Sequence, residues 1–396
     1  MLRLFDDIKH KGEEGKPHSE SDFSYLNRID RIEARRIRKV LEDWFSRYPQ
    51  EHQTDLRIRF RSTEFHSAFF ELLLHEILFC LNCDVKVHPD LQDYKTKRPD
   101  FLVKSNNSKR FILEATSTTD MSEREMANEK IKDLIYDKIN EKLISPDYFI
   151  IIQILATSTE TPSSSGIVSF LAERLADLNY NEISMIASEK SMSSLPHFTY
   201  EKKNWIIDFI PWPKPPEARG STELRPIIGQ SIAFHEVDTW RAIRDAILSK
   251  AGYYGEMNMP FVIALNVLRR HVADLEILDA LVGQEAVQFL KTKSGKHLER
   301  VIRLPNGVWI GKTGKRYTRV SAVLIFCNTT PWNVTKSKVC LYHNPFAAMP
   351  YESVLCQLPQ FSVQKDLKIV KTEGTALSKI LELGSDWPEE ERTHPK

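Results

Sequence analysis

Three acidic residues between Glu64 and Thr116 are placed so that their carboxylates would meet at one metal-binding point. Glu71 lies in an amphipathic helical pattern, Asp100 immediately precedes a short apolar segment, and Glu114 lies in the next such segment. Carboxylate oxygens suit hard cations such as Mg²⁺, which takes only one or two protein carboxylates together with water and substrate phosphate. Such a metal lowers the pKa of a bound water and neutralises charge that develops on a phosphate. The pattern therefore predicts metal-assisted phosphodiester hydrolysis, with Mg²⁺ as the cofactor or Mn²⁺ in its place.

A helix and three strands are expected to position these groups. Apolar residues recur at three- and four-residue spacing through 64–82, which predicts a helix with one buried face. Alternating valines predict a short strand that Pro89 stops, because proline cannot donate to a strand ladder. The segments 101–103 and 111–116 predict two more strands, joined by a polar turn. Two carboxylates brought together by adjacent strands repel one another, so this arrangement favours a cation between them.

These residues resemble a known family. Pro99 and Asp100, thirteen intervening residues, and Glu114 followed by alanine and threonine, with Glu71 on a preceding helix, are similar to the PD-(D/E)XK nuclease superfamily, which has the restriction endonuclease-like fold. The resemblance covers roughly residues 64–156. It implies that Glu71, Asp100 and Glu114 hold the metal, and that the protein is a Mg²⁺-dependent DNA endonuclease. It also suggests a role in restriction, repair or defence against phage.

One position departs from the family pattern. The family's lysine, two residues after the glutamate, falls on Thr116, which cannot stabilise a pentacoordinate phosphate by charge. Members with a displaced lysine are known, and the following helix offers Lys130, our first choice as electrophilic helper, and then Lys132; Asn128 could face the site as well. The alternative is a non-catalytic nucleic-acid-binding or scaffold protein on a degenerate nuclease fold.

The elements after Thr116 continue the resemblance. Ser122 and Glu125 have the spacing of a capping box, and the pattern to 143 predicts a helix. The near-continuous apolar run 148–155 predicts an interior strand that is covered on both faces. Helix, three strands, helix, strand is the core order of the family fold.

The expected fold class is α/β, with a restriction endonuclease-like core, an N-terminal helix and a C-terminal α/β extension or second domain. The expected divisions are a mobile leader (1–24), an N-terminal helical segment (25–62), the nuclease-like core (63–157), the C-terminal extension for substrate or partner recognition (167–383) and a disordered tail (384–396).

Composition fits a soluble globular protein: of 396 residues, 41% are apolar and 28% are charged. No apolar run approaches the roughly 18 to 20 residues needed to cross a bilayer, so no membrane partner is expected. The first residues lack the apolar core of a signal peptide. Five cysteines, few and odd in number, fit reduced thiols. Together these observations predict a cytoplasmic location.

Basic charge is concentrated in one stretch. Net charge is only +1, but residues 291–319 carry nine lysines or arginines against one acid, with Trp309 and Tyr317 among them. Basic side chains neutralise phosphates and aromatic rings stack on bases. The interpretation is a DNA contact, with RNA left open, and the alternative is a solvated hairpin. Whether the protein forms a homo-oligomer or is a partner subunit of a defence system is a separate question, and the sequence leaves both alternatives open. The expected nucleic-acid-binding residues are Lys312, Lys315, Arg316 and Arg319.

Overall fold

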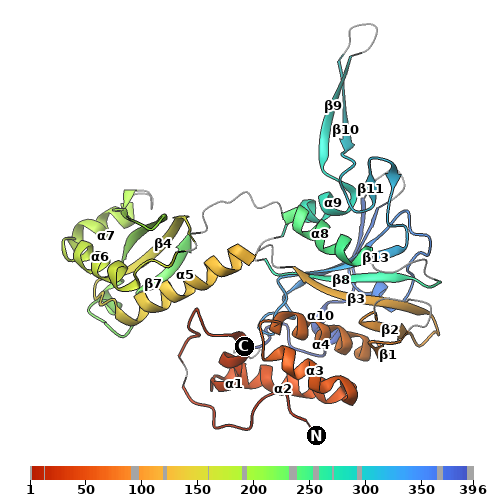
Figure 1. Cartoon of the computed structure of the whole chain (residues 1–396), viewed down its shortest axis with the longest axis horizontal. Helices are drawn as coiled ribbons and strands as arrows, with labels where there is room; N and C mark the ends of the chain where they lie inside the picture. Colours follow the sequence, from red (N-terminus) through yellow and green to blue (C-terminus); the bar gives the residue numbers. More distant parts are fainter. Residues whose placement is uncertain are drawn as a thin grey trace, which may run out of the picture. The chain divides into compact units, whose positions relative to one another are not determined.

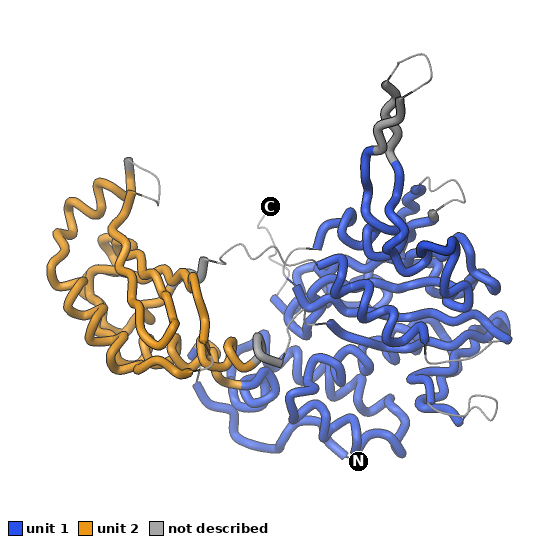
Figure 2. Tube along the Cα trace, turned by 45° about the horizontal axis from the view of Figure 1, so that its top comes forward, with its two compact units in different colours: residues 1–14, 21–120, 238–396 blue, residues 15–20, 121–237 orange. Residues whose placement is uncertain are grey.

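The structure is a computed structural model, and it describes residues 2–12, 14–90, 98–118, 123–158, 160–189, 194–231, 239–252, 258–269, 272–291, 297–363 and 369–389. The chain forms two compact units that alternate along the sequence (Figure 2). Unit 1 comprises residues 1–14, 21–120 and 238–396, and unit 2 comprises residues 15–20 and 121–237. Unit 2 is therefore an insertion, in sequence, into unit 1.

Unit 1 contains a large mixed sheet. Among the described residues it has eight strands in the order β1-β2-β3-β8-β13-β14-β15-β16 (Figure 1). Neighbouring strands are antiparallel from β1 to β3, parallel from β3 through β8 to β13, antiparallel from β13 to β14, parallel from β14 to β15 and antiparallel from β15 to β16. Their bounds are β1 (Asp84–Val87), β2 (Phe101–Lys104), β3 (Arg110–Thr118), β8 (Phe261–Val267), β13 (Val320–Cys327), β14 (Lys338–His343), β15 (Gln360–Val363) and β16 (Ile369–Thr372).

Helices cover both faces of this sheet, because side chains alternate along each strand. On β3, Phe111 and Leu113 pack into the core beneath the N-terminal helices, whereas Ile112 packs into the core on the opposite face. The first face carries α1 (Asp22–Arg28), α2 (Ile32–Arg47), α3 (Gln50–Phe60), α4 (Phe65–Cys80) and α10 (Leu377–Ile380). The second face carries α8 (Thr239–Ala251) and α9 (Asp274–Val282) (Figure 1).

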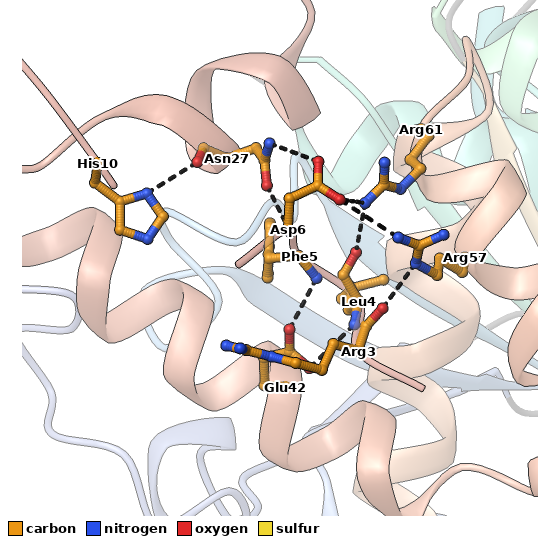
Figure 3. A network of polar contacts seen from close by, with 9 residues as sticks. All are labelled: Arg3, Leu4, Phe5, Asp6, His10, Asn27, Glu42, Arg57 and Arg61. Atoms are coloured by element: carbon orange, nitrogen blue, oxygen red, sulfur yellow. Dashed lines mark hydrogen bonds and ion pairs between the residues drawn. The ribbon is translucent and has the colours of Figure 1, made fainter. Parts of the chain in front are cut away.

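The first residues of the chain pack onto the N-terminal helices. Leu4 and Phe5 are buried, and their backbone amides donate to the Glu42 carboxylate at 3.1 and 2.8 Å (Figure 3). This differs from the mobile leader that the polar sequence predicts, because two apolar side chains anchor the segment. At the other end, Trp387 is buried and its indole Nε1 donates to the carbonyl of Pro331 at 3.1 Å. The predicted disordered tail is thus packed at its start, and 390–396 lie outside the described residues.

Two hairpins of unit 1 lie outside the main sheet. The longer one pairs β9 (Glu285–Lys291) with β10 (His297–Arg303), and the shorter one pairs β11 (Ile310–Gly311) with β12 (Gly314–Lys315). In Figure 1 the β9–β10 ribbon projects away from the sheet. Its base is fixed to α9, because Arg303 contacts Asp279 at 2.6 Å and Glu285 at 3.1 Å. A short 3₁₀ helix, η3 (Val354–Gln357), precedes β15.

Unit 2 has its own sheet and core. Among its described residues, four strands lie in the order β5-β6-β4-β7. Helical and strand residues of the unit share one hydrophobic cluster, in which Ile139, Ile150 and Phe209 are buried. The elements are α5 (Glu123–Lys142), β4 (Tyr148–Ala156), α6 (Ser164–Ala176), α7 (Tyr180–Glu189), β5 (Phe198–Lys202), β6 (Trp205–Pro213), η2 (Pro216–Ala218) and β7 (Ile227–Ser231).

The prediction that the run 148–155 completes the core around Glu114 is wrong. The run is an interior strand, as predicted, but it is β4 of unit 2, which pairs antiparallel with β6 and parallel with β7. The parallel neighbour of β3 is instead β8, more than a hundred residues further along the chain. The prediction failed because a buried apolar strand looks the same in sequence whichever sheet it joins. None of the described helices is long and apolar enough to span a bilayer.

Candidate active site

The centre of the candidate site is the start of β2, beside the middle of β3. Because Phe101 pairs with Leu113 in this antiparallel ladder, Asp100 comes directly beside Glu114. The Asp100 carboxylate accepts a hydrogen bond from the backbone amide of Ala115 at 2.7 Å. The backbone amide of Asp100 donates to Glu114 Oε2 at 3.3 Å. β2 begins at Phe101, but β3 continues past the paired Leu113 to Thr118. We call the place where the ladder between these strands ends, beside Asp100 and Glu114, the notch.

A lysine from the third segment of unit 1, residues 238–396, completes this pair. Lys250 lies in the last turn of α8, the helix that covers this face of the sheet, and its Nζ contacts Glu114 Oε1 at 2.7 Å. Glu114 is almost fully buried, whereas the Lys250 side chain keeps about a quarter of its surface exposed. A lysine ammonium thus lies beside Glu114, whereas the residue two positions after Glu114 is Thr116.

The electrostatics of the notch favour a cation. Burial, followed by the charges of Glu114 and Glu71, raises the pKa of Asp100 to about 7, and Lys250 only partly opposes this. A carboxylic acid whose pKa lies so high is short of positive charge around it. The displaced pKa also marks Asp100 as a functional candidate, because catalytic sites are where such shifts gather.

Glu71 belongs to the same cluster but is already engaged. Its Oε1 accepts from the Tyr48 hydroxyl at 2.5 Å and its Oε2 from Arg59 at 2.7 Å. His88 lies between it and Asp100, with Nε2 3.4 Å from Glu71 Oε1 and Nδ1 3.9 Å from Asp100 Oδ1. Burial alone would raise the pKa of Glu71, but the hydrogen bonds from His88, Arg59 and Tyr48 outweigh it and lower the pKa to about 2.

The donor set fits a magnesium ion better than a metal that needs a full protein cage. Within the described residues, no group of three or more histidine, cysteine, aspartate or glutamate side chains is arranged to hold a metal. Mg²⁺ needs only one or two carboxylates, with waters and substrate phosphates filling the other positions. Asp100 and Glu114 are two adjacent carboxylates, and the raised pKa of Asp100 indicates a place for added positive charge.

The structure thus brings Glu71, Asp100 and Glu114 into one cluster. The helix with the proposed replacement lysines belongs to unit 2: Lys130 is exposed, Lys132 pairs with Glu129 at 2.5 Å, and Asn128 donates to Thr157 at 3.0 Å. The role of Lys130 stays a prediction.

Sequence reasoning missed three residues of the cluster: Lys250, His88 and Arg59. Lys250 precedes a buried strand at the end of an amphipathic helix, and that was the available signal. To use this signal, one must recognise that α8 and β8 are the helix and strand of unit 1 that come next after β3, beyond the whole of the inserted segment 121–237. His88 carried a weaker signal, a histidine next to a strand-ending proline. Arg59 gave none, because arginines alternate along its helix.

The residues of the basic stretch differ in how far they are exposed. On the β11–β12 hairpin Lys312, Lys315 and Arg316 are exposed, and the Arg316 guanidinium lies 5.1 Å from the centre of the Tyr317 ring. Arg319 is half-buried. Trp309 is fully buried, so the prediction that it stacks on bases is wrong. Residues 292–296 lie outside the described residues.

Comparison with known proteins found no match for the chain among protein families, curated proteins or solved structures.

Proposed function

We propose that unit 1 is a metal-dependent nuclease that hydrolyses phosphodiester bonds of DNA at Asp100, Glu114 and Lys250. The observation that carries the proposal is the meeting of two adjacent carboxylates with a lysine ammonium in one notch of the sheet. Carboxylates, a hard cation and a lysine are the groups that phosphoryl chemistry uses, because its transition state gathers negative charge on the phosphate oxygens.

Each residue has a distinct part in this proposal. Asp100 and Glu114 would hold Mg²⁺ or Mn²⁺, and the bound metal would supply a water of lowered pKa and neutralise phosphate charge. Lys250 lies beside Glu114 and is long enough to turn its ammonium toward a phosphate oxygen, which supplements the positive charge where the family's own lysine is missing. The amide of Ala115 holds the Asp100 carboxylate in place.

The element order of unit 1 supports the resemblance to the PD-(D/E)XK superfamily. If unit 2 is set aside, α4, β1, β2, β3, α8 and β8 follow one another as helix, three strands, helix and strand. β8 then lies parallel to β3, as the sixth element of that series. In this proposal the second helix and fourth strand of the family core come after the insertion, and Lys250 is the displaced lysine. Restriction or defence against phage is the setting that the resemblance suggests.

DNA as the substrate is supported by the exposed charge of unit 1. The segment 304–327 carries four basic residues and no acidic residue, and three of the basic residues lie exposed on the β11–β12 hairpin. Neutralising phosphates with such side chains releases counterions and supplies affinity that does not depend on base sequence.

A second candidate is a binding protein without turnover. It is favoured by the ion pairs that Glu71 and Glu114 already make with Arg59 and Lys250. Such pairs neutralise carboxylates without a metal.

One assay separates the two candidates. Supercoiled plasmid, single-stranded DNA and RNA are incubated with the full chain in Mg²⁺, Mn²⁺ or EDTA, beside Glu114→Gln. The nuclease proposal expects metal-dependent cutting of DNA that the variant loses. DNA binding without cutting in every metal would instead support the binding protein.

A further inference from the structure

Glu71 is enclosed by donors rather than open to the notch. Its side chain is about 95% buried, the Tyr48 hydroxyl donates to one oxygen at 2.5 Å, and the Arg59 guanidinium donates to the other at 2.7 Å. A divalent cation bound to this same carboxylate would lie within a few ångströms of the guanidinium. Two cations at that distance in a poorly solvated site repel each other strongly. Glu71 is therefore better suited to hold Arg59 than to hold a metal. Glu114 differs, because the ammonium beside it is carried on a flexible lysine stem that can turn away when a cation binds.

Arg59 is itself held in place from several sides. Its Nε donates to Asp55 at 2.8 Å, so two carboxylates fix the plane of the guanidinium. Arg57 of α3 and Arg61, which directly follows the helix, lie four residues apart and both contact the N-terminal segment. Arg57 donates to the carbonyl of Arg3 at 2.7 Å, and Arg61 contacts Asp6 at 2.6 Å (Figure 3). Helix α3 is thus anchored on one face and presents Arg59 to Glu71.

His88 connects Glu71 to Asp100. Its two ring nitrogens lie 3.4 Å from Glu71 Oε1 and 3.9 Å from Asp100 Oδ1, and its backbone amide donates to the Asp100 carbonyl at 2.9 Å. Its backbone has φ of +42°, in the left-handed region that a residue with a side chain adopts at a cost. Such a conformation persists only where the surroundings hold it. The His52 ring lies edge-on to the His88 ring, with 5.3 Å between the ring centroids.

From these contacts, and resting on the proposed function, we infer that Arg59 and Glu71 form a positioning pair. The pair holds the His88 ring and, through it, sets the placement of Asp100. Glu71 is not a ligand of the metal in this arrangement, in contrast to the role that the family resemblance implies. Among the described residues, the ligand positions belong to Asp100 and Glu114.

The first test needs neither metal nor substrate. Side-chain ¹⁵N spectra of the histidine-labelled full chain are recorded for the wild type, Arg59→Met and Glu71→Gln, with the His88 signals assigned from His88→Gln. The inference expects the His88 ring signals to shift in both variants, and to stay in place in Arg35→Met, which breaks a similar but exposed pair with Asp30. Unshifted His88 signals in Arg59→Met would overturn it. Should Arg59→Met fail to fold, the double variant Arg59→Met/Glu71→Gln removes both charges together and serves in its place.

The second test separates positioning from ligation. Free Mn²⁺ is measured by electron paramagnetic resonance as the metal alone is titrated into each protein, and plasmid cleavage gives kcat and KM. The inference expects Glu71→Gln to keep Mn²⁺ affinity within about threefold while kcat falls about 10- to 100-fold at little change in KM. Asp100→Asn should lose Mn²⁺ affinity at least tenfold. The double variant should lose no more kcat than the worse single variant, because the pair acts as a unit.

Two results overturn the inference: Glu71→Gln losing as much Mn²⁺ affinity as Asp100→Asn, or the two single losses in kcat adding up in the double variant. Failure of the proposed function looks different. In that case the wild type binds no Mn²⁺ and cuts no DNA, while the histidine spectra still report whether Arg59 and Glu71 hold His88.

Discussion

Lys250 Nζ and Glu114 Oε1 are 2.7 Å apart although 136 residues separate them in sequence. The whole of unit 2 lies between them along the chain, apart from its segment 15–20. The contact joins α8, which covers one face of the main sheet, to β3, the third strand in the order of that sheet. It supplies positive charge to a notch that otherwise gathers carboxylates.

Removing Lys250 should destabilise the metal-free protein. Lys250→Met leaves the nearly buried Glu114 carboxylate without this partner, at an expected loss of about 2 kcal/mol in the free energy of unfolding, less than for a fully buried pair because Lys250 is partly exposed. The double variant Lys250→Met/Glu114→Gln should recover most of the loss. Urea denaturation in EDTA measures both. Equal stability of the wild type and Lys250→Met would mean that the ion pair contributes nothing.

The exposed charges of the β11–β12 hairpin should set the affinity for DNA. Replacing Lys312, Lys315 and Arg316 together by alanine should weaken binding about 10- to 100-fold at low salt and reduce the slope of log Kd against log salt by about 3, one for each lost phosphate contact. Fluorescence anisotropy with a labelled duplex over a salt series measures both quantities. The matched control replaces three exposed lysines elsewhere, at 104, 202 and 203. An equal effect in the control would remove the hairpin's special role.

The N-terminal segment should contribute to the stability of unit 1. Leu4 is fully buried, so Leu4→Ala removes packing and leaves a cavity, at an expected cost of about 3 kcal/mol. Leu2 is 40% exposed, and Leu2→Ala should change the free energy of unfolding by less than about 0.5 kcal/mol. Chemical denaturation of the two variants gives the comparison. Similar values for both would show that the segment does not pack as described.

His75 should make stability depend on pH. Burial, and then the charge of Arg47, lower the pKa of this histidine from 6.5 to about 4. Between pH 6.5 and pH 4 the His75 side chain is therefore protonated in the unfolded chain but neutral in the folded chain. The free energy of unfolding then falls as the pH drops from 6.5 toward 4. Between pH 7 and pH 5 the wild type should lose about 2 kcal/mol more than His75→Phe. Urea unfolding at the two pH values tests this, and parallel losses in both proteins would refute a neutral buried His75.

The local elements of the candidate site were predictable and their long-range partners were not. The helix with Glu71 and the strands beside Asp100 and Glu114 follow from apolar spacing, because each is specified within a few residues. The pairing of β3 with β8 depends on a contact across an inserted unit, which local periodicity does not encode. Lys250 was missed for the same reason. Burial of Trp309 was missed because an aromatic residue among charges has the same pattern in a core as on a surface.

If Asp100, Glu114 and Lys250 form a metal-dependent hydrolytic site, DNA cleavage should need each of them. The measurement is cleavage of supercoiled plasmid in Mg²⁺ by the wild type beside Asp100→Asn, Lys250→Met and the control Asp90→Asn, whose side chain is 76% exposed. We expect cutting that EDTA abolishes, a loss of at least about 100-fold in Asp100→Asn and Lys250→Met, and full activity in Asp90→Asn. Cutting that survives in Asp100→Asn at the wild-type rate would contradict it.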